Sequence, residues 1–489
     1  MNAFARILEW PVLPDDARPL ALWDAVEIAR ATGGVAVGEF QVAGADIDSR
    51  DVIDGDLFFA LKGEAMDGHR FVDTAFAKGA AAVVVDRPVE GPHVLVNDTS
   101  SALELLAKAA RNRADATIIG VTGSVGKTGV KEAIFAALDR ASRGRAHRSV
   151  KSYNNHVGVP LSLVRMPARS KYGVFEMGMN HKGEIAALTR LVRPHVAVVT
   201  TIAPAHIEML GSEAAIADAK AEIFEGLEPG GVAIIPADSP HFARLRDAAQ
   251  RCGAAVVSFG RTAHADVRLL DAVSAPGGGS LVTADLGDRR VCYTVAAPGD
   301  HWIANSLAVM AAVRAAGGDL GAAGLALAEL QGLKGRGARS EVAAPRGDGS
   351  GTALVIDESY NANPASMRAT LAQLGATPAR RRIAVLGAMK ELGEHGPAYH
   401  AALIEPIAAA GIDRLFLVGD EMQALADELG KAPRGALGKP IPFAHCTSAA
   451  AALEALARFG VEGGDALLVK GSNSVGLGAV VAALVKQEG

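Results

Sequence analysis

The alternation of strand-like and helix-like segments constrains the fold of this chain more than any other feature. Short apolar runs follow one another between residues 117 and 259, and helical stretches separate them. The runs are TIIGVT, GVFEM, HVAVVTTI, GVAIIP and AAVVSF. Because a helix between two strands carries the chain back across the sheet, such strands lie parallel to each other. We therefore predict an α/β fold whose central part is a parallel sheet wrapped by helices.

Similar alternation on both sides of this central part predicts three domains. Residues 1–110 contain the strand-like runs GDLFFAL and AAAVVVD around the helix-like FVDTAFAKGA, which indicates a small α/β unit. The glycine- and arginine-rich segment GLKGRGARS, residues 332–340, is typical of an interdomain connector. After it, ALVID, RIAVLG, RLFLVG and DALLVKG alternate with helices, so we expect a second parallel α/β domain there. The predicted borders are 1–110, 111–332 and 333–489.

The end of the central domain departs from the strand–helix rule. Residues 265–297 read as short alternating strands with APGGGS and GD turns, so a β-meander is expected. The helix-like HWIANSLAVMAAVRAAG, residues 301–317, follows and should close this domain.

Composition indicates a soluble enzyme of the cytoplasm. The 489 residues are 49% hydrophobic and 21% charged, and the net charge of −5 gives no reason to expect nucleic acid as a partner. No apolar run approaches the length of a membrane span, and the first residues lack the apolar region of a secretion signal. The three cysteines are widely spaced, which fits neither a disulfide framework nor a zinc site.

A glycine loop between the first central strand and its helix predicts a phosphate site. In GVTGSVGKT the backbone N–H groups can turn towards phosphate oxygens at the positive end of a helix. Lys127 would reach the terminal phosphates and Thr128 would bind Mg²⁺. The loop departs from the common motif because Val121 stands where the first glycine is expected, and a chance Lys-Thr after a glycine-rich helix entry is the alternative. The predicted phosphate-binding residues are Gly123, Ser124, Val125, Gly126, Lys127 and Thr128.

Two polar residues follow neighbouring strands of the predicted sheet. Glu176 ends the strand in GVFEM, and His206 comes after HVAVVTTI. The carboxyl ends of parallel strands share one edge of the sheet, where ligands bind. Glu176, His206 and Thr128 are therefore a candidate Mg²⁺ environment, although histidine is an unusual ligand for a hard cation.

A lysine in the predicted helix AAIADAKAEIFEGL, residues 214–227, points the wrong way for a surface charge. Lys220 falls within the apolar stripe of this helix. The stripe consists of Ile216, Ile223, Phe224 and Leu227, and the opposite face carries Asp218, Glu222 and Glu225. Either the lysine packs its methylenes and extends its charge to water, or it has a function inside the protein.

The ordered set of motifs resembles the Mur ligase superfamily, the ATP-dependent amide-forming ligases of peptidoglycan synthesis, along essentially the whole chain. The motifs are TGSVGKT, EMGMNHKGEI, APAHIEMLGS, AKAEIFEGL, GDHWIANSLAVMAA, GRGARSE, DESYNANPASM and LGAMKELGEHG. Within the family, YNNHVGVPLSL, DESYNANPASM and the N-terminal DSRDVIDGDLFFALKGEAMDGHRF resemble the branch that adds D-alanyl-D-alanine. The DNPR signature of the diaminopimelate-adding branch is absent.

The resemblance implies a reaction in which ATP phosphorylates the terminal carboxylate of UDP-N-acetylmuramoyl-tripeptide. The amine of D-alanyl-D-alanine then displaces phosphate from the acyl phosphate. By resemblance Thr128 and Glu176 hold one Mg²⁺, and His206 and a carbamylated Lys220 hold a second. A carbamate, formed from CO₂ and the neutral amine, would turn the inward-facing lysine into an oxygen ligand. Lys127, Lys220, His206 and Glu176 are thus the candidate catalytic residues.

The resemblance also assigns residues that contact the substrates. For ATP these are Asn305 near the adenine and Arg336 and Asp357 near the ribose or phosphates, with Arg339 as the alternative connector arginine. For the UDP substrate they are Ser49, Arg50, Lys62, Asn154 and Asn155, and for the dipeptide Tyr360, Asn361 and Asn363. Each asparagine can instead be a turn residue or a helix cap. We expect a monomer, with a third domain that closes over ATP and excludes water.

Other functions stay open at this point. Another amino-acid-adding member of the superfamily, of the diaminopimelate-adding or folylpolyglutamate type, would share the ATP site. A P-loop kinase or NTPase would turn over ATP without a second amine, and a nucleotide-binding scaffold would not turn it over at all. The sequence does not tell whether the tripeptide ends in diaminopimelate or lysine.

Overall fold

The computed structural model describes residues 21–486, apart from 64–65, 151, 206, 276–278, 331, 345–350 and 432–439. Contacts divide the chain into two compact units. The first comprises residues up to Ala116 together with Ser149–Lys171, and the second comprises Thr117–Arg148 together with Tyr172 onwards. The three domain borders drawn from the sequence stay predictions.

The first unit is built on a small sheet in which the neighbouring strands run parallel, except for an antiparallel edge strand. In spatial order the strands are β2 (Val35–Val37), β7 (His93–Leu95), β6 (Ala82–Val85), β5 (Asp56–Phe59) and β4 (Gly44–Asp46). The continuous apolar runs at β5 and β6 are buried along their whole length, as expected for strands covered on both faces. The unit also contains β1 (Trp23–Asp24) paired with β3 (Gln41–Val42), η2 (Gly68–Phe71), α1 (Ala25–Thr32), α2 (Val72–Ala77), α3 (Thr99–Arg113) and α5 (Gly158–Val164).

The second unit contains a nine-stranded sheet that carries the glycine loop. From one edge its strands are β9 (Ala146–Arg148), β10 (Tyr172–Glu176), β8 (Thr117–Thr122), β11 (Val196–Val199), β12 (Val232–Pro236), β13 (Ala255–Gly260), β14 (Val267–Ser274), β15 (Ser280–Asp285) and β16 (Arg290–Val295). Strands β9 to β14 are parallel and the last two pairs are antiparallel. The predicted parallel sheet and β-meander are both confirmed. The meander extends the central sheet because β14 pairs with β13.

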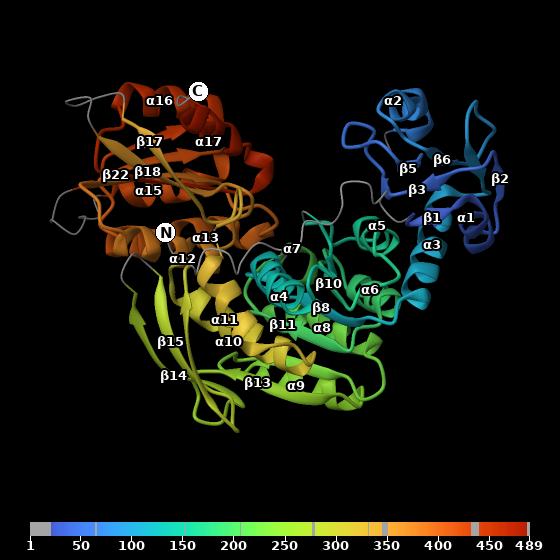
Figure 1. Cartoon of the computed structure of the whole chain (residues 1–489). Helices are drawn as coiled ribbons and strands as arrows, with labels where there is room; N and C mark the ends of the chain where they lie inside the picture. The colour runs from blue at the N-terminus through green and yellow to red at the C-terminus, as the bar shows by residue number, and fades with distance from the viewer. Residues whose placement is uncertain are drawn as a thin grey trace, which may run out of the picture. The chain divides into compact units, whose positions relative to one another are not determined.

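Helices enclose the central sheet on both faces. One core joins the sheet to α4 (Lys127–Ser142), α10 (Asp300–Ala315) and α11 (Leu320–Glu329), and Figure 1 shows α10 and α11 side by side along it. A Cβ at Gly120 of β8 would meet Ile223, so the segment after Lys220 covers the opposite face. The remaining helices of this part are α6 (Glu184–Val192), α7 (Ile207–Leu210), α8 (Glu213–Ala221), η3 (Glu222–Gly226) and α9 (Phe242–Arg251).

The prediction of a single helix over residues 214–227 is wrong in its second half. The α-helix ends at Ala221 and the chain continues as the 3₁₀ turn η3. The assignment of Glu222 to the exposed face is also wrong, since this residue is buried. Its carboxylate accepts hydrogen bonds from the backbone N–H groups of Gly183 (2.7 Å) and Ala186 (3.1 Å). These bonds to α6 draw Glu222 inwards, which helical periodicity within 214–227 does not reveal.

The C-terminal part of the second unit is a six-stranded sheet with helices on its faces. Its strands, in spatial order, are β17 (Ala338–Ala343), β18 (Thr352–Glu358), β22 (Asp465–Lys470), β19 (Arg381–Gly387), β20 (Arg414–Val418) and β21 (Phe443–Cys446). They are parallel except for β17. The predicted connector 332–340 therefore includes the start of a strand. Figure 1 shows α16 (Ala449–Phe459) and α17 (Gly478–Val485) on one face and α12 (Pro364–Ala376) and α13 (Gly396–Ala401) on the other.

The remaining elements of this part are short helices: η4 (Gly393–His395), α14 (Ile404–Ala409), η5 (Asp420–Met422), α15 (Gln423–Gly430) and η6 (Asn473–Val475). Within the residues that the structure describes, no helix is both long and apolar enough to cross a bilayer.

Candidate functional site

The glycine loop leaves β8 in a conformation that requires its glycines. Gly123 has φ +145° and Gly126 has φ +89°, and α4 begins at the next residue, Lys127. A Cβ at Gly123 would lie 2.0 Å from Oγ1 of Thr200, and one at Gly126 would lie 2.8 Å from Nδ2 of Asn305. Asn305, predicted to lie near the nucleotide base, is therefore packed directly against the loop.

The end of the neighbouring strand β11 holds the loop in place. Ser124 donates its backbone N–H to the carbonyl of Thr201 (2.7 Å) and its hydroxyl to the carbonyl of Ala203 (2.9 Å). Thr200 donates its hydroxyl to the carbonyl of Val125 (2.6 Å). The sequence analysis missed both residues. The hydroxyl of Thr200 at a strand end beside a phosphate loop was a usable signal, whereas Thr201 acts through its backbone carbonyl, which its residue type does not reveal.

Thr128 and Glu176, two of the predicted metal ligands, meet in the structure. The Thr128 hydroxyl, in the first turn of α4, donates to Oε2 of Glu176 at the end of β10 over 2.8 Å. Both side chains are buried. They meet because β10 pairs with β8 in parallel, so both strands end at the same edge of the sheet. Hydroxyl and carboxylate oxygens are ligands that Mg²⁺ binds, so this pair fits the expected ion.

Lys220 lies inside the protein, with 1% of its surface exposed. The interpretation in which its methylenes pack and its ammonium reaches water is therefore wrong. Burial, and secondarily the positive charge of Lys127, hold the pKa of Lys220 well below 10.5. An amine in this setting spends more time neutral, and the neutral amine is the form that reacts with CO₂.

His206 lies outside the described residues. Its neighbour Ala205 is buried, and α7 begins directly after it at Ile207. Among the residues that the structure describes, no group of three or more His, Cys, Asp or Glu side chains gathers as a metal site. A metal centre here would thus depend on Thr128 and on Lys220, neither of which belongs to those residue types.

Further charges act on the loop lysine. Lys127 donates its ammonium to the carbonyl of Gly123 (2.7 Å). Burial and the nearby Arg336 lower the pKa of Lys127, while Glu176 opposes the shift. Arg336 stacks its guanidinium 4.2 Å from the centre of the Tyr360 ring. Arg339 instead donates to Oγ1 of Thr377 (3.2 Å), so Arg336 is the connector arginine whose charge acts at the loop.

Asp357 in β18 and the two predicted asparagines that follow this strand form hydrogen bonds within the protein. Asp357 accepts from the backbone N–H of Gly335 (2.8 Å) and from the Ser359 hydroxyl (2.6 Å), so it anchors the connector. Asn363 caps α12 by accepting from the Ser366 N–H (2.9 Å). Asn361 accepts from the N–H that follows it, and its carbonyl accepts from the buried ammonium of Lys470 (3.0 Å).

A cavity of about 350 Å³ borders these residues. Tyr360, Asn361 and Asn363 form part of its wall, and Ala205 contributes from the segment that follows β11. Lys390, Glu391 and Ser472 complete the polar lining. A cavity bordered by Ala205 and by the predicted dipeptide loop can accommodate a small polar substrate.

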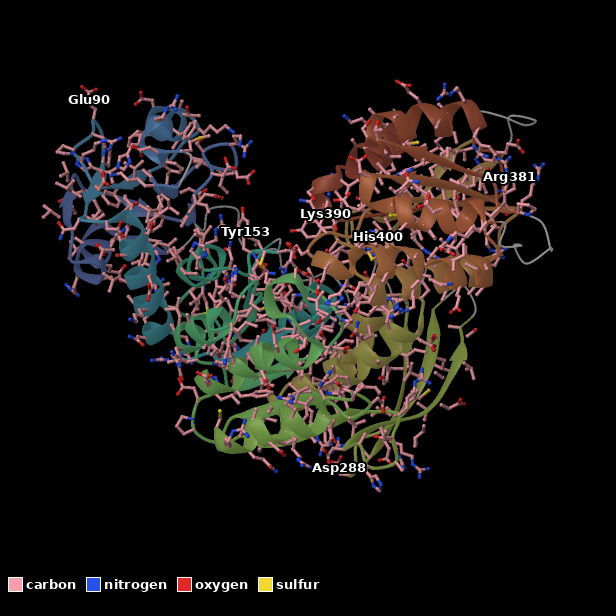
Figure 2. All side chains as sticks on the ribbon, turned by 180° about the vertical axis from the view of Figure 1, so that it is seen from behind. Glu90, Tyr153, Asp288, Arg381, Lys390 and His400 are labelled. Atoms are coloured by element: carbon pink, nitrogen blue, oxygen red, sulfur yellow. The ribbon has the colours of Figure 1, made fainter. Side chains whose placement is uncertain are left out.

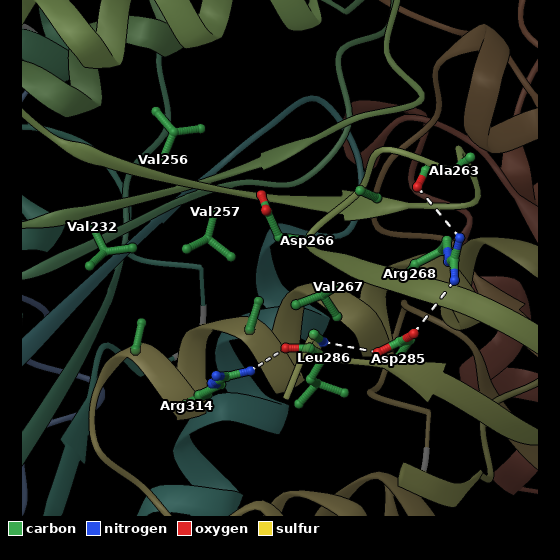
Figure 3. Close-up of a pocket in the computed structure, with 14 residues that line it drawn as sticks. Val232, Val256, Val257, Ala263, Asp266, Val267, Arg268, Asp285, Leu286 and Arg314 are labelled. Atoms are coloured by element: carbon green, nitrogen blue, oxygen red, sulfur yellow. Dashed lines mark hydrogen bonds and ion pairs between the residues drawn. The ribbon is translucent and has the colours of Figure 1, made fainter. Parts of the chain in front are cut away.

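A larger cavity of about 650 Å³ lies elsewhere in the second unit, around β13, β14 and α10 (Figure 3). Arg314, which lines it, is nine residues after Asn305 on α10, or roughly 14 Å along the helix axis. Both of its arginines have partners in the cavity wall: Arg268 pairs with Asp285 over 3.5 Å, and Arg314 donates to the Leu286 carbonyl (Figure 3). The glycine loop, not this cavity, therefore marks the candidate site.

The predicted UDP-binding residues belong to the first unit. Ser49 is buried, while Arg50 is exposed and pairs with Asp48 over 2.7 Å. Lys62 forms an ion pair with Asp86. Asn155 accepts from the backbone N–H of Gly158 (2.9 Å) at the start of α5, and Asn154 lies one residue before it.

Three family models match successive parts of the chain. The Mur ligase family catalytic domain matches residues 41–115, the Mur ligase middle domain residues 121–313, and the Mur ligase glutamate ligase domain residues 339–473. The UDP-N-acetylmuramoyl-tripeptide–D-alanyl-D-alanine ligase of Synechocystis is 38% identical over 452 residues, 90% of this chain and 91% of that protein.

Solved structures resemble more than nine-tenths of the chain as well. A crystal structure of MurF from Acinetobacter baumannii superposes with a TM-score of 0.79 at 30% identity, covering 95% of this chain and 99% of that one. The MurF ligase of Thermotoga maritima, in complex with ADP, has a TM-score of 0.72 at 26% identity, covering 91% and 97%.

Proposed function

The chain belongs to the Mur ligase family, and we propose that it joins D-alanyl-D-alanine to the terminal carboxylate of UDP-N-acetylmuramoyl-tripeptide at the expense of ATP. It is an ATP-dependent ligase that forms a C–N bond in peptidoglycan synthesis. The single observation that carries the chemistry is the meeting of a phosphate loop with the Thr128–Glu176 pair at the carboxyl edge of a parallel sheet.

The residues of the loop support phosphoryl transfer to a carboxylate. A carboxylate has no leaving group for an amine to displace, and phosphorylation supplies one. We assign Lys127 and the backbone N–H groups of the loop to the ATP phosphates, whose negative charge they offset, except the N–H of Ser124, which donates to the Thr201 carbonyl. Asn305, Arg336 and Asp357 are assigned to the rest of the nucleotide, with Arg336 favoured over Arg339 because its charge acts on Lys127.

Mg²⁺ held by Thr128 and Glu176, and a second ion held by His206 and carbamylated Lys220, would supply positive charge beside the transferred phosphoryl group. The burial and lowered pKa of Lys220 support the carbamate, because only the neutral amine reacts with CO₂. Lys220→Ala should lose activity and regain part of it with short-chain carboxylates. Full activity of the variant without them would overturn the carbamate assignment.

The two substrates are assigned to different parts of the chain. Ser49, Arg50, Lys62, Asn154 and Asn155 are proposed to contact the UDP substrate, and Tyr360, Asn361 and Asn363 to border the dipeptide. The capping role of Asn363 means that its backbone and position, more than its amide, would serve the dipeptide. We place the reaction in the cytoplasm and the active protein as a monomer of three domains, bordered near residues 110 and 332.

The decisive experiment measures phosphate release from ATP while each substrate is omitted in turn. We expect release only when UDP-N-acetylmuramoyl-tripeptide and D-alanyl-D-alanine are both present, and loss of release in Lys127→Ala. Release that ignores the dipeptide would indicate a kinase or NTPase and refute the proposal. A further arm offers diaminopimelate instead of D-alanyl-D-alanine, together with a UDP-sugar precursor that carries two amino acids instead of three. Phosphate release in this arm would assign the protein to another branch of the family.

Closure of the third domain is a separate part of this proposal. Arg336 acts on Lys127 from a glycine-rich connector, so ATP contacts would come from both sides of it. Small-angle scattering should show compaction when an ATP analogue and the UDP substrate bind, and an unchanged radius of gyration would contradict closure.

A further inference from the structure

The loop that follows β19 contains a backbone conformation that its residue type disfavours. Glu391 has φ +63°, in the left-handed region. Arg143 and Arg193, the other non-glycine residues with positive φ in the described parts of the chain, end helices, where this conformation is common. Glu391 ends no helix, so its conformation has another origin.

Bonds from three neighbouring segments hold this loop. The N–H of Met389 donates to Nε2 of His400 (2.9 Å), and the N–H of Lys390 donates to the Ser472 hydroxyl (3.0 Å); Figure 2 labels Lys390 and His400 in this region. The carbonyl of Glu391 itself accepts from the N–H of Glu208 (3.3 Å) in α7. The surrounding structure thus imposes the conformation, which is how strain persists at functional positions.

Glu391 lies in the lining of the cavity of about 350 Å³. Asn361, Ser472 and Tyr360 line the same cavity, and so does Ala205, the residue before His206. Among its described lining residues, Glu391 is the one carboxylate. The carbonyl bond to Glu208 also ties Glu391 to the helix that follows residue 206. The described lining of the cavity therefore offers a single anionic group, in the same cavity as the predicted dipeptide loop.

The second substrate needs such a group. The amino group of a dipeptide has a pKa of about 8, so it enters largely as an ammonium ion. It must give up a proton before its nitrogen lone pair can attack the acyl phosphate. A carboxylate binds an ammonium through charge-assisted hydrogen bonds and can receive that proton.

Resting on the proposed function, we propose that Glu391 binds the amino group of D-alanyl-D-alanine and accepts its proton during amide formation. The nitrogen forms a bond to the acyl carbon, the bond from that carbon to the phosphate oxygen breaks, and phosphate leaves with the electron pair. The ammonium first gives one proton to the Glu391 carboxylate, which passes it to water. Once the bond to carbon has formed, the nitrogen gives its second proton to the leaving phosphate. Glu391 is thereby a catalytic residue of the second half-reaction and has no part in the first.

Two nucleophiles separate the half-reactions. Hydroxylamine is neutral at pH 7.5 and captures an acyl phosphate without a carboxylate to receive its proton. ADP release from UDP-N-acetylmuramoyl-tripeptide and ATP should therefore continue in Glu391→Gln with hydroxylamine. With D-alanyl-D-alanine as the nucleophile, the kcat/KM of Glu391→Gln should fall about 100-fold below that of the wild type. Glu394→Gln, an exposed neighbour in η4, is the matched control and should behave as the wild type with both nucleophiles.

Glu391→Gly separates chemistry from conformation, because glycine adopts φ +63° without strain. The proposal predicts that it loses dipeptide-dependent release like Glu391→Gln. Dipeptide-dependent release at the wild-type rate in either variant would overturn the role of Glu391, and so would equal losses with both nucleophiles. Wild-type protein that releases ADP with neither nucleophile would instead refute the proposed function.

Discussion

Replacing Glu222 by alanine is the perturbation that tests most directly how the site is held together. The Glu222 carboxylate is buried and accepts two backbone N–H groups, over 2.7 and 3.1 Å, at the start of α6. Gly183 is the N-cap of this helix and has no side chain that could accept these bonds in place of Glu222. A hydrogen bond to a charged group contributes about 1.5–3 kcal/mol, and the helix dipole adds about 0.3–1 kcal/mol. Two such bonds and the dipole together give about 3–7 kcal/mol, and we expect Glu222→Ala to lower the free energy of unfolding by that amount.

Urea unfolding of the full chain, followed by circular dichroism, measures this loss in the transition of the second unit. Hydrogen exchange shows where in the chain the stability is lost, because the amides at the start of α6 should exchange faster in the variant than in the wild type. Glu222→Gln keeps one acceptor oxygen and should lose about half as much stability.

Glu225→Ala is the matched control from the same 3₁₀ turn. Glu225 pairs with Arg190 over 2.7 Å, but the two side chains are 40% and 66% exposed, so this pair should contribute below about 1 kcal/mol. If Glu222→Ala unfolds at the same urea concentration as Glu225→Ala, and exchange in α6 is unchanged, Glu222 does not anchor this helix.

Three further predictions follow from burial and packing. In CO₂-free buffer Lys220 is a free amine whose pKa burial lowers below 10.5. The unfolded chain then holds that proton more tightly, and the cost to folding grows as pH falls below about 10. Lys220→Met should abolish ligase activity. The variant should nevertheless unfold at a higher urea concentration than the wild type at pH 7, and at the same urea concentration near pH 10.5. Lower stability of the variant at pH 7 would contradict this. Gly126→Ala should raise the KM for ATP at least about tenfold and lower the free energy of unfolding by about 1–3 kcal/mol. The reason is that residue 126 has a left-handed conformation, in which a Cβ would lie 2.8 Å from Asn305. An unchanged KM and an unchanged melting temperature would count against this packing. Burial lowers the pKa of His301 to about 4, so the unfolded chain alone gains this proton between pH 6.5 and 4, and stability falls as pH falls through that range. Between pH 6.5 and 4, His301→Gln should therefore lose about 1–3 kcal/mol less stability than the wild type. Parallel curves of stability against pH for the two proteins would contradict this role of His301.

Local sequence patterns were sufficient where burial alone determines structure. The runs TIIGVT and DALLVK became buried strands because a parallel sheet covered on both faces selects continuous apolar segments. The inward direction of Lys220 was also correct, since its position in the apolar stripe fixes the face on which it lies.

The same patterns failed where a distant partner determines the outcome. Glu222 sits at an exposed offset of an ideal helix, yet bonds to residues 36 and 39 positions earlier bury it. The connector was predicted to end at residue 340, but pairing with β18 makes residues 338–343 a strand. Neither pairing partner lies within the window that such patterns sample.

The sequence by itself determined which chemical groups this protein carries and in what order: a glycine loop with its lysine and threonine, a glutamate at a strand end, and a lysine on an apolar face. Only the tertiary structure decided which of them meet. Thr128 reaches Glu176 across 48 residues because β10 lies beside β8, and Glu391 borders a cavity with Ala205 because its loop packs on α7. Strand order and loop packing arise from contacts summed over the whole unit, so no local pattern encodes them.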